Sequence, residues 1–349
     1  MTTTEREITE AVRLCTPDGR RLDPMAKGWS RRPLHTANLR GSWGRNKKWD
    51  YWAILTGDLV VSVTYADVDY LGIVGIWWCD LATGRTGGHD DNPPGARGVE
   101  LPDRPGSTPL RWTTKTMSVV ISDDERGTVI DAEWREKDGT VAELHAVIEL
   151  PDGHESLNVV IPWSERRFQY TSKHQARPAR GVLRVGGRTY EFGEADRAGA
   201  DRREAWGVLD VGRGRWPYRN VWNWAGGAGR CADGHVVGLQ FGGKWTEGTD
   251  FTENGLIIDG RLSKIGDELI WDYSWDEPLG RWSVRSADGS VDVELMPVHD
   301  RHTRVEAAVL GMHVHQVFGN WQGTVGDDEG VEHHLRGLLG FAEEARNRW

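Results

Sequence analysis

The chain has 349 residues, a length that favours two domains over one. Its formal net charge of −10 argues against nucleic acid as a partner, because phosphate binding needs a cationic surface. The composition is globular with one outlier, 19 Trp against 7 Tyr and 6 Phe, which indicates large buried faces or a pocket lined by flat rings.

The cysteines and the N-terminal residues indicate the compartment. Cys15, Cys79 and Cys231 lie far apart and one of them must be unpaired, which favours free thiols in a reducing environment. Residues 1–10 are polar and acidic and lack the apolar core of a signal peptide. No apolar run approaches the roughly 18 residues that span a bilayer. We therefore expect a cytoplasmic protein without a membrane span.

Short helices are expected at the two ends, over residues 4–14 and 342–349, and strands almost everywhere between them. The expected strands are short runs rich in Val, Ile and aromatic residues: 59–65, 117–122, 128–134, 141–150, 157–161, 236–241, 269–273, 291–296 and 304–316. Asp-Gly pairs, which suit tight hairpin turns, stand between several of these runs. Alternating strands and amphipathic helices are missing, so we expect antiparallel sheet that closes into barrels or pairs as sandwiches.

Two irregular segments interrupt the strand pattern. Residues 84–109 are rich in Pro and Gly without a hydrophobic period, which favours a mobile insertion over a pocket lid. Residues 162–187 are basic, and we place a domain boundary within them, at 175/176. The expected domains are residues 1–175 and residues 176–349, which have similar length and strand density. Two copies of one β architecture would explain that similarity.

The second half holds the densest cluster of unusual residues. Residues 209–218 combine Gly, Arg, Trp and Tyr, and Trp222-Asn223-Trp224 follows before two glycines. Paired Trp rings build apolar walls, and Asp210, Tyr218 and Asn223 could converge on them as the polar groups of a small-molecule pocket. The alternative, which we favour slightly, is that these Trp side chains fill the base of a barrel beside an Asp–Arg ion pair.

Two further motifs could carry chemistry. Glu253 could act as an acid or base if it is partly buried, although Glu-Asn-Gly is also an ordinary turn. His313 and His315 fall on one face of a strand, a spacing that several metal sites use. A metal needs a third ligand, and His299, His302 and His333 are only loosely placed. A hydrogen-bonding pair of His315 and Gln316 is therefore favoured, and we expect no metal and no other cofactor.

Three segments together resemble a bacterial family described only as a domain of unknown function, DUF2804: residues 48–52; residues 170–173 with 210–218 and 222–224; and residues 252–255 with 315–319 and the tail to Trp349. The resemblance covers the chain from about residue 12 to residue 349. That family is similar in turn to carotenoid 1,2-hydratase-type proteins and to lipocalin-like cyclases of polyketide biosynthesis. The resemblance implies an all-β fold of two lipocalin-like antiparallel β-barrel domains, and it carries no catalytic residues across.

From the resemblance and the residues we expect a hydratase, isomerase or cyclase that acts on a hydrophobic small molecule such as a polyene, a terpenoid or a polyketide. Asp210 or Glu253 would protonate an alkene, and Trp faces would stabilise the developing cation. Tyr218 and His315 complete the expected catalytic set by positioning water or the polar ends of the substrate. The expected ligand contacts are Trp216, Trp222, Asn223, Trp224, Asn254, Gln316 and Lys173.

Two other functions stay open. A non-catalytic carrier or sensor of a hydrophobic ligand would use the Trp side chains for burial alone. A carboxyl desolvated in the pocket, with a raised pKa, would separate an enzyme from such a carrier. A carbohydrate-binding protein or glycosidase ranks third, because flat rings stack on sugars but hydrolysis needs two nearby carboxylates. The oligomeric state does not follow from the sequence.

Overall fold

A computed structural model describes residues 3–193, 204–307 and 309–349. Nearly all regular structure in these segments is β-strand, and the helical element among them is one 3-10 turn, η1 (Pro24–Ala26). The expected all-β fold built of antiparallel sheets is confirmed. Among the residues so described, no helix is both long enough and apolar enough to cross a membrane.

The strands are numbered in chain order. They are β1 (Val12–Arg13), β2 (Trp29–Ser30), β3 (His35–Thr36), β4 (Asn46–Thr56), β5 (Leu59–Asp67), β6 (Gly72–Asp80), β7 (Arg85–Asp91), β8 (Leu110–Thr113), β9 (Met117–Asp124), β10 (Gly127–Arg135), β11 (Val141–Glu149), β12 (Leu157–Ser164), β13 (Arg167–Val185), β14 (Arg188–Phe192), β15 (Ala205–Arg215), β16 (Arg219–Arg230), β17 (Val236–Gly243), β18 (Asn254–Ile258), β19 (Arg261–Ile265), β20 (Ile270–Asp272), β21 (Trp282–Arg285), β22 (Val291–Ala307), β23 (Leu310–Gly326) and β24 (Glu332–Arg348).

The chain forms two compact units, and each unit is assembled from separated segments. Unit 1 comprises Met1–Arg45, Gly153–Ala176 and Arg213–Trp349, and unit 2 comprises Asn46–Asp152 and Arg177–Gly212. The chain passes from unit 1 into unit 2 between Ala176 and Arg177. The boundary expected at 175/176 lies one residue before this crossing. The expected domains, residues 1–175 and 176–349, stay a prediction.

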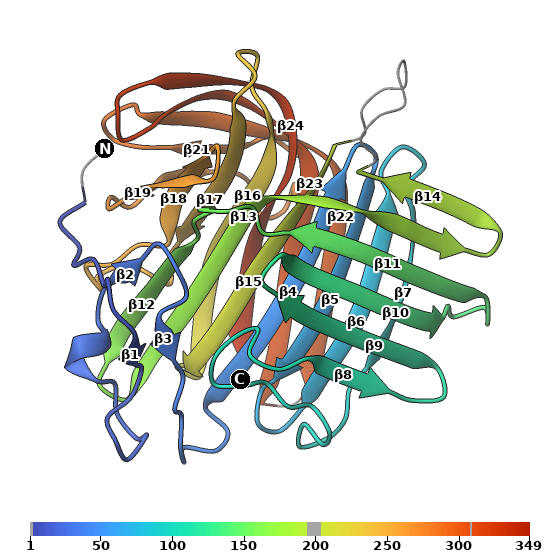
Figure 1. Ribbon diagram of the computed structural model, residues 1–349, viewed down its shortest axis with the longest axis horizontal. Coiled ribbons are helices and arrows are strands. Elements are labelled where there is room, and N and C mark those ends of the chain that lie inside the picture. The colour runs from blue at the N-terminus through green and yellow to red at the C-terminus, as the bar shows by residue number, and fades with distance from the viewer. Residues whose placement is uncertain (1–2, 194–203, 308) are drawn as a thin grey trace. The chain divides into compact units, whose positions relative to one another are not determined.

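In unit 2 the strands are neighbours in the order β7-β6-β5-β4-β15-β13-β11-β10-β9-β8, with β14 paired to the end of β13 (Figure 1). β10 shows why these sequences form sheet: Ile130, Ala132 and Trp134 are buried, while Asp131 and Glu133 between them are exposed. This alternation puts apolar side chains on one face and acids on the other, as a half-buried strand requires. The apolar faces of the strands meet in one core.

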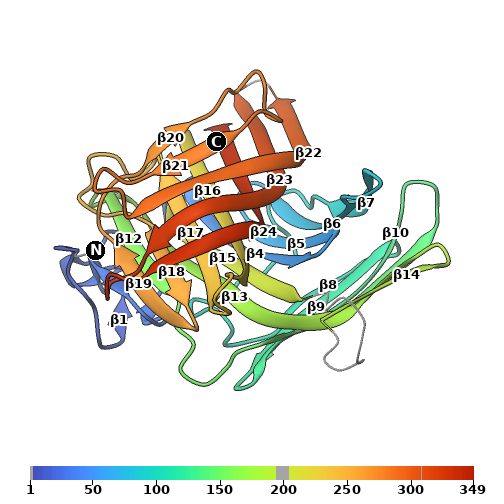
Figure 2. The ribbon, with the colours of Figure 1, turned by 90° about the horizontal axis from the view of Figure 1, so that it is seen from above.

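In unit 1 nine strands are neighbours in the order β19-β18-β17-β16-β24-β23-β22-β21-β20. Figure 2 shows this sheet curling, with β22, β23 and β24 drawn in the orange and red of the C-terminal part. We call the face inside the curl the inner face, and its core includes Ala225, Phe241, Trp282, Val317 and Ala342.

The opposite, outer face of the sheet lies close to the first part of β13 and to the residues before β18. Glycine is required there, because a Cβ at Gly226 would lie 2.6 Å from Nε2 of Gln175. A Cβ at Gly242 would lie only 2.1 Å from Cγ of Glu253. These glycines therefore let polar side chains of unit 1 lie directly against the sheet backbone.

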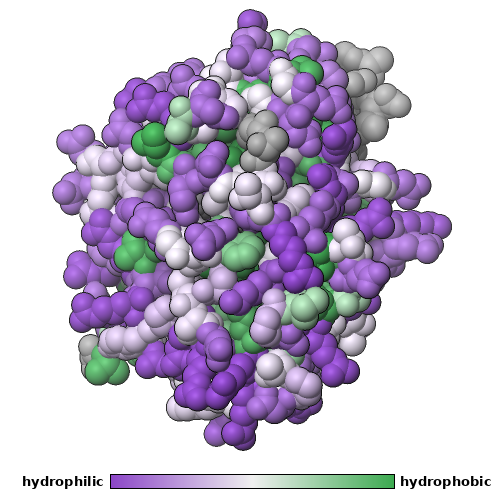
Figure 3. Space-filling model, turned by 90° about the vertical axis from the view of Figure 1, so that its left-hand side faces the viewer, coloured by the Kyte–Doolittle hydropathy of each residue, from purple (hydrophilic) through white to green (hydrophobic). Residues whose placement is uncertain are grey.

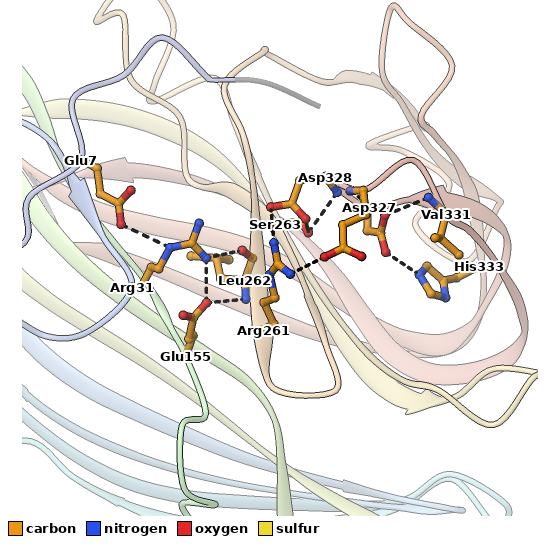
Figure 4. Close-up of polar contacts among 11 residues, drawn as sticks. Glu7, Arg31, Glu155, Arg261, Leu262, Ser263, Asp327, Asp328, Val331 and His333 are labelled. Carbon is orange, nitrogen blue, oxygen red and sulfur yellow. Dashed lines mark hydrogen bonds and ion pairs between the residues drawn. The ribbon is translucent and has the colours of Figure 1, made fainter.

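Polar contacts hold the β18–β19 hairpin in unit 1 on both sides (Figure 4). On one side, Nη1 of Arg31 donates to Glu155 at 2.8 Å and to the backbone oxygen of Leu262 at 2.6 Å. On the other side, the Ser263 hydroxyl donates to Oδ1 of Asp328 at 3.0 Å. The hairpin is thereby joined to the N-terminal residues and to the turn between β23 and β24.

Both expected terminal helices are wrong. Residues 342–348 form the end of β24 and pair with β16 on one side and β23 on the other. Residues 4–14 contain only β1 as regular structure. The basic segment 162–187, expected to be irregular, is mostly β13, and the expected strand 304–316 is divided between β22 and β23. Pairing with neighbouring strands outweighs the helix-forming composition of Glu343, Glu344 and Ala345.

The segment 84–109 is not a simple mobile insertion. β7 lies within it and pairs with β6 over seven residue pairs. Beyond β7, the side chains of Val99 and Leu101 are buried in the core of unit 2, and Pro94 bridges to Leu71. Apolar side chains spaced without a period can still be buried when a loop packs onto a sheet.

Candidate functional site

Four tryptophans of unit 1 gather around Trp216, which the sequence analysis expected among the ligand contacts. The ring of Trp216 lies 4.9 Å from that of Trp163, 5.4 Å from Trp245, 5.5 Å from Trp222 and 5.9 Å from Trp349. Trp216 is 2% exposed, and its Nε1 donates to Oε1 of Gln169 at 2.8 Å. The rings fill their own space, so this tryptophan cluster is packed core at least as much as it is a wall.

A buried ion pair adjoins the tryptophan cluster. Glu253 is 1% exposed and accepts a hydrogen bond of 2.6 Å from Nε1 of Trp245. Nζ of Lys173 lies 3.3 Å from the other carboxylate oxygen of Glu253 and 4.4 Å from the centre of the Trp224 ring. Nε1 of Trp224 in turn donates to Gln240 at 3.1 Å. The structure thus brings Glu253, Lys173 and Trp224 together in one buried network, and their predicted roles stay predictions.

The other predicted residues are placed separately. Asn254 is fully buried and bonds the backbone, accepting from Gly242 at 2.7 Å and donating to Asp267 at 3.0 Å. Tyr218 is 37% exposed and donates to the backbone oxygen of Val309. Gln316 is buried in β23 and pairs in register with Glu343.

Asp210 is the one predicted site residue that lies in unit 2. It is 7% exposed, and its Oδ2 accepts a hydrogen bond of 3.1 Å from Nε1 of Trp49. Its predicted role as a proton donor stays a prediction.

The inner face of the unit 1 sheet carries a polar network that was missed by the sequence analysis apart from Asn223. The Tyr273 hydroxyl donates to Oε2 of Glu344, and Nζ of Lys244 lies 2.7 Å from each of these two oxygens. Nδ2 of Asn223 donates to the same Tyr273 oxygen at 2.8 Å. The Tyr273 ring stacks on Trp282 at 3.9 Å with the planes 3° apart. The network therefore stands where the apolar inner core meets polar groups.

Strand register explains why these residues meet. Asn223 of β16 pairs with Glu344 of β24. Glu344 pairs on its other side with His315 of β23, and His315 pairs with His302 of β22. Residues paired across adjacent strands point to the same face, so the four side chains form one row. Because residues 342–349 were expected to form a helix, the sequence analysis did not place Glu344 beside these residues.

The protonation states of the network follow from burial and hydrogen bonding. Burial and the bond to Glu344 raise the pKa of Tyr273, so its hydroxyl stays protonated. Burial alone would raise the pKa of Glu344, but hydrogen bonds from Lys244, Tyr273 and Arg346 outweigh burial and lower it. An ionised carboxylate is thus held against a hydroxyl proton, an arrangement that can accept one proton and supply another.

Three histidines continue the row on the inner face. Nε2 of His302 lies 2.8 Å from Nε2 of His313, and the rings of His302 and His315 stack at 4.2 Å. Nδ1 of His315 is 2.8 Å from Oδ2 of Asp300. Trp275 packs edge-on against two of these histidines, 4.9 Å from His313 and 4.5 Å from His315. The expectation that His313 and His315 share a face is met, and His302 was the residue that spacing alone could not place.

On the face of the molecule drawn in Figure 3, hydrophilic residues predominate and hydrophobic ones form small separate patches. Single exposed apolar side chains of this kind are ordinary for a globular protein. The inner face of unit 1 is the strongest candidate site, because it places acid–base groups directly beside an apolar core.

The nine-stranded sheet of unit 1 therefore carries a row of polar side chains above its apolar core. The chain matches the family "Domain of unknown function (DUF2804)" over residues 5–349 and belongs to that family. Comparison with curated protein sequences finds no match.

Two solved structures are similar to this chain at low sequence identity. CghA with Sch210972 is 11% identical, with a TM-score of 0.42 over 87% of this chain and 89% of that chain. Kievitone hydratase from Nectria haematococca is also 11% identical, with a TM-score of 0.43 over 88% of this chain and 89% of that chain.

Proposed function

We propose that this chain is an enzyme of the lyase or isomerase class that hydrates, isomerises or cyclises a hydrophobic small molecule by proton transfer. The observation that carries the proposal is the contact of Tyr273, Glu344 and Lys244 at the edge of the apolar inner core. A substrate would lay its apolar part against rings such as Trp282 and bring its reacting double bond to these polar groups.

The chemistry balances with these two residues alone. In a hydration, Glu344 accepts a proton from water, the water oxygen bonds to one alkene carbon, and Tyr273 gives its proton to the other carbon. The proton on Glu344 then returns to the Tyr273 oxygen through the hydrogen bond that joins them. In an isomerisation, Glu344 removes a proton from one carbon and Tyr273 supplies one to another. Asn223 and Lys244 stabilise the phenolate that exists between the two steps.

The pKa shifts narrow the substrate class. Tyr273 with a raised pKa is a weak acid, and Glu344 with a lowered pKa is a weak base. Such a pair suits a double bond polarised by conjugation to a carbonyl better than an isolated alkene, which needs a strong acid. We therefore propose a conjugated, electrophilic substrate.

Glu253 and Lys173 have a structural role in this proposal. Their pairing inside the tryptophan cluster holds the outer face of the sheet, and a substrate would have to displace packed rings to reach them. A catalytic role for Glu253 or Asp210 is tested by Glu253→Gln and Asp210→Asn, each of which would then abolish turnover while leaving ligand affinity nearly intact.

The proposal is tested by native mass spectrometry of the chain purified from its own host, followed by solvent extraction of any bound molecule. We expect an apolar, conjugated compound that the protein converts on incubation. A bound compound that returns unchanged after long incubation indicates a carrier, and a bound sugar indicates a carbohydrate-binding protein. Either of these two results contradicts the proposal.

A further inference from the structure

The three histidines of the inner face hold ring nitrogens close together. One nitrogen from each of His302, His313 and His315 lies within 4.8 Å of the other two. Two of these nitrogens, on His302 and His313, are only 2.8 Å apart. Zinc–nitrogen bonds of about 2.0–2.1 Å can join both at that spacing, and a small rotation of His315 brings in the third.

Strand pairing and neighbouring side chains position the three histidines. They stand on two adjacent strands, in the register that pairs His302 with His315. Asp300 binds Nδ1 of His315 at 2.8 Å, which leaves Nε2 of that ring as the nitrogen that can bind a metal. A carboxylate on the far nitrogen of a ligating histidine fixes the ring and makes it a better donor. Trp275 packs edge-on against His313 and His315.

Charges of both signs surround the three histidines. Arg304 and Arg346 both pair in register with His313 and oppose a cation there. Nε of Arg346 donates to Glu344 at 2.5 Å, and its guanidinium lies 3.6 Å from the Trp275 ring. Asp300 and Glu344 supply two negative charges beside the three neutral ligands. Exposure rises from buried His315 to exposed His302, and His313 also lines a surface pocket of about 260 Å³. A fourth coordination position would face this open side.

We propose that His302, His313 and His315 bind one divalent transition-metal ion, with Zn²⁺ as the best fit. Three imidazoles are a donor set that suits Zn²⁺, Cu²⁺, Ni²⁺ and Co²⁺ and not the oxygen-seeking Mg²⁺ or Ca²⁺. Three protein ligands with an open fourth position are the arrangement of a zinc site that can bind water or a further ligand. The inference goes beyond the proposed function, since metal binding is measured without any substrate.

The test uses the full chain without a histidine tag, stripped with a chelator and titrated with ZnCl₂ by calorimetry and with CoCl₂ by visible absorption. We expect one equivalent of each metal and a Co²⁺ absorption spectrum of low coordination number. His302→Ala removes an exposed ligand without opening the core and is expected to abolish stoichiometric binding. Asp300→Asn should weaken Zn²⁺ about 10- to 100-fold, because it removes only the support of His315.

The matched control is His334→Ala, an exposed histidine of β24 that contacts Glu332 and is not among the three ligands. It should bind Zn²⁺ as the unchanged chain does. The proposal is overturned if the unchanged chain binds no equivalent of metal, or if His302→Ala and His313→Ala bind it normally. Equal loss in His334→Ala overturns it as well, because the metal would then lie elsewhere.

Discussion

Tyr273 belongs to both the core and the candidate site. Its ring is packed on Trp282, while its oxygen is contacted by Asn223, Lys244 and Glu344. Removal of the hydroxyl alone therefore separates chemistry from packing. We expect Tyr273→Phe to lower kcat about 100- to 10,000-fold with KM nearly unchanged, as for loss of a proton-transferring group.

Steady-state kinetics on the substrate recovered from the protein check this prediction. Tyr190→Phe is the matched control, because that hydroxyl contacts Asp80 in unit 2 and takes no part in the proposed chemistry. A rise in KM without a fall in kcat for Tyr273→Phe would show that the hydroxyl only binds substrate.

His35 makes the stability of unit 1 depend on pH. It is fully buried beside Tyr170, and burial lowers its pKa from 6.5 to about 4. The unfolded chain therefore binds a proton at His35 before the folded chain does, and stability falls as the pH drops from about 6.5 to about 4. The full shift corresponds to about 3 kcal/mol.

Urea unfolding at pH 7 and at pH 4.5 measures this dependence. We expect His35→Gln to lose less stability than the unchanged chain over that interval. Exposed His334→Gln should follow the unchanged chain. Identical pH dependence in His35→Gln and the unchanged chain would show that another group dominates.

Single residues of the site could be predicted only where their chemistry is local. Trp216 and Trp222 are close in the sequence and pack against each other in unit 1, and His313 and His315 share a face because strands have a period of two. His302 and Glu344 could not be placed, since their positions depend on strand pairing across long sequence separations.

Glycines control how closely the elements of unit 1 approach. A Cβ at Gly242 would lie 2.1 Å from Cγ of Glu253, so Gly242→Ala must displace the Glu253 and Lys173 pair. We expect a loss of about 1–3 kcal/mol in the free energy of unfolding, as for an overpacked core. Gly326→Ala, whose nearest neighbour would be 3.7 Å away, should change it by less than about 0.5 kcal/mol. Chemical denaturation of both variants measures the difference, and equal effects would contradict the close approach.

Elements with clear alternation were predicted well, and those whose form depends on neighbours were not. β10 and the start of β22 show apolar and acidic residues in strict alternation, and both are strands. The end of β24 carries Glu, Ala and Arg, which favour a helix in isolation, yet it is paired on both sides by β16 and β23. Local composition cannot report such pairing.

At the scale of the whole molecule, the chain crosses between units more than once. Residues 176–349 hold all nine strands of the curled sheet but lack Lys173, which would leave Glu253 buried without its cation. Residues 1–175 lack β15, the neighbour of β4 in unit 2. We expect neither segment to unfold cooperatively when expressed alone, in contrast to the full chain, with thermal denaturation as the measurement. A cooperative transition in either segment would support the simple division at 175/176.

The all-β class and the family could be predicted because both rest on patterns distributed along the whole chain. The discontinuous units could not, since nothing local in the sequence marks which strands become neighbours. The acid–base row of the inner face depends on the same pairing and became visible only with it.

The most direct test of the proposed chemistry is turnover of the recovered apolar compound in heavy water, followed by mass spectrometry of the product. The account predicts that deuterium from solvent is incorporated at carbon in the presence of the unchanged chain, and that Tyr273→Phe largely abolishes incorporation. Incorporation at an unchanged rate in Tyr273→Phe, or a product formed without deuterium, would contradict proton transfer at the inner face.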